Sequence, residues 1–139
     1  MSNANAKALQ LIKKCNTNDP YAIAEAKGIV VLYEDLGSIW GYFHLYKRIP
    51  IIHINNRLTS LQARFTLSHE IGHYILHKDV NTPYLRSSTY LRVDRIESEA
   101  NTFAVRLLVG TNKPFESETE AQFMIRCGIP LAFTRFYKK

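Results

Sequence analysis

The chain has 139 residues, of which 46% are hydrophobic and 22% charged, fractions that are ordinary for a globular protein that buries a core. Its two cysteines, Cys15 and Cys127, form no CxxC pair, and no apolar run approaches the ~18 residues that suggest a membrane span, so neither a disulfide scaffold nor a membrane protein is indicated. The formal net charge of +6 is spread along the chain, which favours a solvated basic surface over a nucleic-acid-binding patch.

Two helices are predicted at the N-terminus, within residues 1–28. The segment NAKALQLIKKC has helical apolar spacing, and NDPYAIAEAKGI offers Asp19 as N-cap, Pro20 at the first helical position and Gly28 as the stop. The opening stretch MSNANAKALQ lacks the apolar block of an export signal. Together with cysteines that suit a reducing compartment, this predicts a cytoplasmic protein.

Three short runs follow, IVVLYED, WGYFHLY and IPIIHIN, which are rich in β-branched and aromatic residues and are separated by LGS and KR. Such runs predict a small, mainly antiparallel sheet. His44 and His53 lie in these strands, where a satisfied core or surface histidine is the expected role. His44 would reach a functional cleft only if its strand lay beside one.

The stretch TLSHEIGHYILHKD, residues 66–79, carries the strongest chemical signal. Apolar residues surround this predicted helix on most sides, so we expect it to be central and buried. His69 and His73 share one helix face, and Glu70 flanks the point where their imidazoles meet. Two neutral imidazoles suit zinc, and a nearby carboxylate can take a proton from water whose pKa the metal has lowered. A buried helix with chance histidines is the alternative, but it would leave two imidazoles to be desolvated.

A second long helix, RIESEANTFAVRLLV, is predicted after a loop, and it offers two candidates for a third metal ligand. Glu97 lies on a largely apolar stripe of this helix, whereas Glu99 aligns with Arg95 on a polar stripe. We therefore predict Glu97 as the ligand and, for Glu99, a solvent-facing ion pair with Arg95. Asn101, one turn after Glu97, is expected to orient a zinc-binding histidine.

HEIGHYILH followed by IESEANTFAVRLL resembles the ImmA/IrrE-type metallopeptidases of bacteria, phages and mobile elements, over roughly residues 20–110. The resemblance implies a zincin-like α+β fold in which a zinc ion (Zn²⁺) is held by His69, His73 and Glu97. His77, one turn beyond the pair, is also typical of the family and is expected to act outside the first ligand shell. The family commonly ends its second helix with a proline, where this chain has LLVGTNKP, so a different exit from that helix is expected.

Two regions stay open at this level. Tyr84, Tyr90 and Arg92, expected in the loop between the two metal helices, are unranked candidates for stabilising an oxyanion. The tail TEAQFMIRCGIPLAFTRFYKK has a helix, a break at Gly128 and a second apolar and basic segment, similar in outline to a helix-turn-helix. Helix packing is the favoured role for this tail.

We expect one domain over residues 1–139, with the N-terminal helices in 1–28, the sheet and metal site in 29–110 and a helical tail in 111–139. The leading hypothesis is a zinc-dependent endopeptidase with Glu70 as general base and the substrate extended along a sheet edge. The resemblance implies that the substrate is a helix-turn-helix repressor of a phage or mobile element, cleaved in the bacterial cytoplasm to relieve repression. The alternative is a non-catalytic regulatory protein that keeps the metal fold and binds a repressor or DNA.

Overall fold

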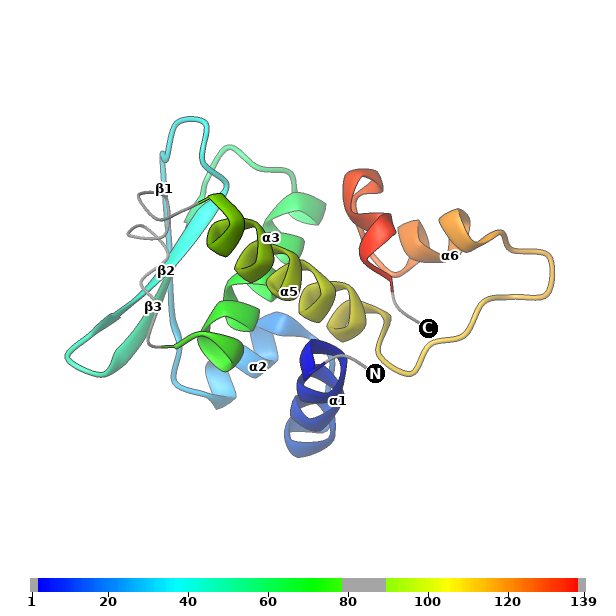
Figure 1. Ribbon diagram of the computed structural model, residues 1–139, viewed down its shortest axis with the longest axis horizontal. Coiled ribbons are helices and arrows are strands. Elements are labelled where there is room, and N and C mark those ends of the chain that lie inside the picture. Colours follow the sequence, from blue (N-terminus) through cyan, green and yellow to red (C-terminus); the bar gives the residue numbers. More distant parts are fainter. Residues whose placement is uncertain (1–2, 79–89, 138–139) are drawn as a thin grey trace.

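The computed structural model describes residues 3–78 and 90–137 and shows an α+β fold, as predicted (Figure 1). The elements follow one another in the order α1 (Asn3–Cys15), α2 (Pro20–Ala26), β1 (Val30–Glu34), β2 (Gly41–Tyr46), β3 (Ile49–Asn55), α3 (Ser60–Leu76), α5 (Tyr90–Val109), α6 (Glu120–Arg126) and the 3₁₀ helix η1 (Leu131–Phe136). None of the helices in the described ranges is long and apolar enough to cross a membrane.

The helix boundaries follow from local capping. The Asp19 side chain accepts a hydrogen bond from the Tyr21 backbone N–H at 3.0 Å, and Pro20 occupies the first turn of α2, as predicted. Thr59 and Gln62 form a reciprocal capping box that starts α3. The end of α2 is followed by Gly28 at φ +69°, a left-handed conformation that favours glycine.

The sheet has the strand order β1-β3-β2 and is mixed, which corrects the expectation of a mainly antiparallel sheet. β2 and β3 form an antiparallel hairpin whose two turn residues, Lys47 and Arg48, both have positive φ. β1 pairs with β3 in parallel, from Val30 opposite Ile51 to Glu34 opposite Asn55. β3 lies between β1 and β2 and has the most buried residues of the three strands.

One face of the sheet packs against the helices, which lie together on one side of it in Figure 1. The main core joins buried side chains of the sheet, α3 and α5: Phe43, Ile52, Ile54, Leu67, Ile71 and Phe103. A Cβ added at Gly72 would lie 3.0 Å from the Phe103 ring, so glycine at this position lets α3 and α5 approach closely. α3 is therefore central and buried, as its sequence predicted.

A second buried cluster attaches the C-terminal tail to α3 and α5. It joins Phe65 of α3 with Leu108 of α5 and with Phe123 and Met124 of α6. The part after the Gly128 break is a six-residue 3₁₀ helix, so the described tail does not supply the second α-helix of a helix-turn-helix. Packing is the observed role of the tail.

Candidate metal centre

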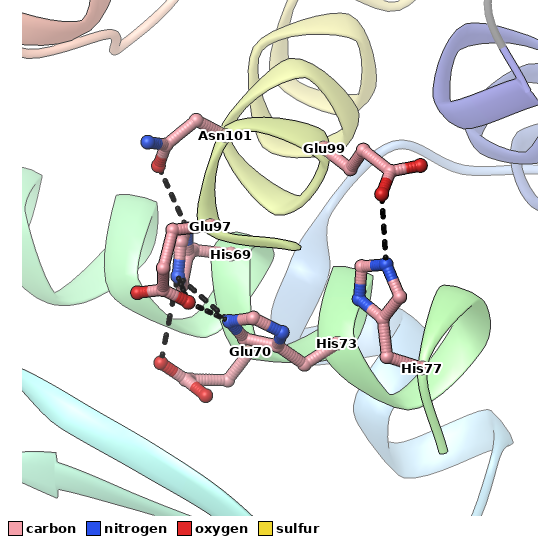
Figure 2. A network of polar contacts seen from close by, with 7 residues as sticks. All are labelled: His69, Glu70, His73, His77, Glu97, Glu99 and Asn101. Atoms are coloured by element: carbon pink, nitrogen blue, oxygen red, sulfur yellow. Dashed lines mark hydrogen bonds and ion pairs between the residues drawn. The ribbon is translucent and has the colours of Figure 1, made fainter. Parts of the chain in front are cut away.

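α3 brings His69, Glu70 and His73 to one point, because residues one helical turn apart share a face. The Nε2 atoms of His69 and His73 lie 3.1 Å apart, and Glu70 Oε2 lies 3.9 Å from His69 Nε2 (Figure 2). One ligand atom from each of these three residues falls within 4.8 Å of the others. Glu70 and His73 are buried, and His69 keeps a small exposed part, so the group faces an opening.

Glu97 reaches the same point from α5. Its Oε1 atom contacts His73 Nε2 and lies 3.5 Å from His69 Nε2, as Figure 2 shows. The three residues that the sequence predicted as ligands are therefore brought together from two helices that are distant in the sequence. A set of two imidazole nitrogens and one carboxylate oxygen fits a divalent transition metal.

Glu99 lies on the other side of α5, away from this point (Figure 2). Its Oε1 atom is 3.3 Å from His77 Nε2 and 3.7 Å from Arg95 Nε. The ion pair with Arg95 was predicted, and the contact with His77 was not. His77 caps the end of α3. The centroid of its ring lies 5.6 Å from that of His73, so His77 is next to the candidate centre without joining it.

Asn101 holds the imidazole of His69 from the side opposite the centre. Its Oδ1 atom lies 2.7 Å from His69 Nδ1. An amide oxygen only accepts, so Nδ1–H donates. When the ring is neutral its lone pair is therefore on Nε2, which points at His73 and Glu97; when the ring is protonated, Nε2–H donates to Glu97. The contact predicted for Asn101 is present.

The surroundings of His69, His73 and Glu97 shift their pKa values in ways that suit the binding of a cation. Burial lowers the pKa of His73 to about 4, although Glu97 opposes this, so His73 is neutral near pH 7. Burial alone would lower the pKa of His69, but Glu97 and Glu70 outweigh it and the pKa is raised. Burial raises the pKa of Glu97, yet the hydrogen bonds from His69 and His73 outweigh burial and hold it well below its usual range. A bound metal would replace the proton that His69 otherwise shares with the carboxylate.

A cleft of about 350 Å³ opens onto the centre. Its lining includes the polar group His69, Glu70, Glu97 and Asn101. The other lining residues come from the segment before and at the start of β2, from α3 and from η1: Ser38, Ile39, Trp40, Gly41, Phe65, Thr66 and Phe133. Residues 38–41 lead into the edge strand β2, so an extended chain lying along this edge would pass the metal centre.

Residues 24–122 match the peptidase family described as the IrrE N-terminal-like domain. The chain belongs to this family. It is 42% identical over 105 residues to uncharacterized immunity region protein 2 of Bacillus phage phi105, an alignment that covers 75% of this chain and 66% of the relative. It is 35% identical over 105 residues to metallopeptidase ImmA of Bacillus subtilis (strain 168), covering 74% of this chain and 61% of that protein. The chain thus spans less than two thirds of the length of either relative.

Two cleft residues of this IrrE-like chain were not found by sequence reasoning. Trp40 and Phe133 come from segments 93 positions apart, and their rings meet edge to face with centroids 5.9 Å apart. Phe133 also stacks on Phe65 at 4.3 Å. η1 lies beyond the residues that match the family, and no local pattern reveals that its side chains return to α3.

The remaining candidates of the sequence fall elsewhere. Tyr90 and Arg92 lie in the first turn of α5 and not in the predicted loop. The helix begins earlier than predicted, because its first ten residues, YLRVDRIESE, contain no glycine or proline that would interrupt it. The side chains of Tyr90 and Arg92, and the whole of Tyr84, lie outside the described residues. His44 does not line the cleft; it contacts His53, which agrees with the expectation of satisfied strand histidines.

Proposed function

We propose that this chain is a zinc-dependent endopeptidase in which His69, His73 and Glu97 hold the metal. The observation that carries the proposal is the arrival of Glu97 Oε1, from α5, at the two Nε2 atoms presented by α3. Its membership of the IrrE-like peptidase family and its similarity to a metallopeptidase support the same reading.

Zinc is the metal that we propose for this donor set. Two imidazoles and one carboxylate are a known ligand set for catalytic zinc, which keeps a fourth position for water or substrate. A zinc ion held here would polarise the scissile carbonyl and lower the pKa of water. Asn101 would keep His69 in the tautomer that ligates.

Glu70 is the general base of the proposed reaction. Its side chain is buried against His69, on the wall of the cleft, and it is not needed to complete the ligand set. From there it would take the proton of the attacking water and later pass it to the leaving amine. The edge of β2 would hold the substrate chain extended beside it.

The proposed substrate is a helix-turn-helix repressor of a phage or mobile element, cleaved in the bacterial cytoplasm to relieve repression. The similarity to an immunity region protein of a Bacillus phage supports this setting. The family resemblance of the HEIGHYILH and IESEANTFAVRLL segments supports the same substrate class.

The test replaces Glu70 by Gln in a cell that also expresses the repressor encoded beside the gene. Glu70→Gln keeps the side-chain size and all three ligands, so metal content should be unchanged while repressor cleavage, followed by mass spectrometry, falls roughly 10²- to 10⁴-fold. Glu99→Gln is the matched control and should cleave like the parent protein. If Glu70→Gln relieves repression as well as the parent does, the chain acts by binding and the endopeptidase proposal is wrong.

A further inference from the structure

A second pair of histidines lies on the outer face of the sheet, away from the helices. Phe43 and Ile52 point into the core against α3, and successive residues of a strand point to opposite faces. His44 and His53, each next in sequence to one of these residues, therefore occupy the other face. Tyr42 lies directly opposite His53 in the register, and His44 is its diagonal neighbour.

The two rings present their Nε2 atoms to each other at 2.9 Å, with ring planes inclined by only 19°. Two nitrogens that each lie about 2.0–2.1 Å from one ion would be about 2.9 Å apart at a right angle and about 3.3 Å apart at the tetrahedral angle of zinc sites. The spacing is thus within the range that a shared metal ion requires, and it is close to the 3.1 Å between the Nε2 atoms of His69 and His73.

The back of His53 is held as it is in metal sites. Glu34 Oε1, from β1, accepts a hydrogen bond from His53 Nδ1–H, which leaves the lone pair of the neutral ring on Nε2, facing His44. A carboxylate on the far nitrogen of a ligating imidazole fixes the tautomer and strengthens the ligand. Tyr42 stacks on the same ring at 4.3 Å and fixes its orientation.

Exposure and charge also suit a binding site. The His53 side chain is 12% exposed and that of Glu34 is 46% exposed. Solvent and ions can therefore reach both side chains, although neighbouring residues cover most of the His53 ring. The Glu34 carboxylate lies behind His53, an arrangement that favours a cation at the imidazole pair.

We propose that His44 and His53 form a second metal site, which binds a divalent transition metal such as Zn²⁺ through their Nε2 atoms, with Glu34 as the positioning residue. Water completes the coordination, so this site is weaker than the three-ligand centre. The competing arrangement is a hydrogen bond in which His44 Nε2–H donates to His53 Nε2, with no metal bound.

The test counts zinc ions per chain on untagged, folded protein as free zinc is raised from nanomolar to submillimolar concentrations. The parent should bind one equivalent at low zinc and a second at high zinc. His44→Gln and His53→Gln should each lose the second equivalent and keep the first, whereas Tyr46→Gln, a control at an exposed residue of the same strand as His44, should keep both. Glu34→Gln should weaken the second step about 10- to 100-fold and leave the first unchanged.

A parent protein that stops at one equivalent, or a His44→Gln protein that still binds two, would overturn the second site. His44→Gln is the deciding variant if His53→Gln fails to fold, because the His53 ring is also packed between Tyr42 and Glu34. The readout is metal stoichiometry, so the result does not depend on whether the chain cleaves a repressor.

Discussion

Glu97 and Glu99 are two positions apart on α5, and a helix turns about 100° per residue, so their side chains leave the helix about 160° apart. One reaches His69 and His73, and the other reaches His77 and Arg95. Helical phase alone therefore decides which carboxylate can join the centre. The same phase places Asn101, one turn after Glu97, against the Nδ1 atom of His69.

The two glutamates give a matched pair for a metal-affinity experiment. Glu97→Ala removes one of three proposed ligands, so zinc affinity should fall by more than the roughly 10- to 100-fold typical of outer-shell contacts. Glu99→Ala should leave the affinity near that of the parent. Competition with a chromogenic chelator measures both. Equal zinc affinity in the two variants would contradict the assignment of Glu97.

At the scale of elements, local patterns predicted what depends on neighbours in the sequence. Asp19 and Pro20 marked the start of α2, and the HEIGH spacing placed two histidines on one face of α3. The strand order was not predicted, because the parallel pairing of β1 with β3 joins two strands that are not neighbours in the sequence. The contact between Trp40 and Phe133 joins segments 93 residues apart, and no periodicity encodes it.

The C-terminal 3₁₀ helix η1 forms one wall of the cleft through Phe133. Phe133→Ala removes the ring that stacks on Phe65 and meets Trp40 edge to face, so the environment of Trp40 becomes more polar. Trp40 is the only tryptophan of the chain, and its fluorescence should shift to longer wavelength while zinc content stays unchanged. Phe115→Ala is the control, because Phe115 is 65% exposed and packs on Arg126. An unchanged Trp40 spectrum in Phe133→Ala would argue against this wall.

At the scale of the whole molecule, the candidate metal centre lies on the helix that the two buried clusters share. Leu67 and Ile71 of α3 belong to the cluster shared with the sheet, whereas Phe65 belongs to the cluster shared with the C-terminal tail. His69 and His73 share a helix with all three side chains, so the packing of α3 and α5 that stabilises the fold also sets the distance between the proposed ligands on the two helices. Stability and metal geometry are coupled for this reason.

The burial of His73 in this centre makes the stability of the metal-free protein depend on pH. The pKa of His73 is about 4 in the fold, against an ordinary 6.5, so between these values the unfolded chain binds more protons than the native one. The free energy of unfolding should therefore decrease as the pH falls from 6.5 to 4, by on the order of 3 kcal/mol from this residue. His69, whose pKa is raised, contributes in the opposite direction at higher pH.

Urea unfolding of chelator-treated protein at several pH values measures this dependence. His73→Gln, which cannot take up a proton, should flatten the curve between pH 4 and 6.5, whereas Glu25→Gln should follow the parent, because Glu25 is exposed on α2. Zinc added at pH 7 should raise the free energy of unfolding of the parent by mass action, and much less so that of His73→Gln, which lacks one ligand. A parent protein with the same stability at pH 4 and 6.5 would show that His73 is not held neutral by burial, and the account of the centre's electrostatics would then be wrong.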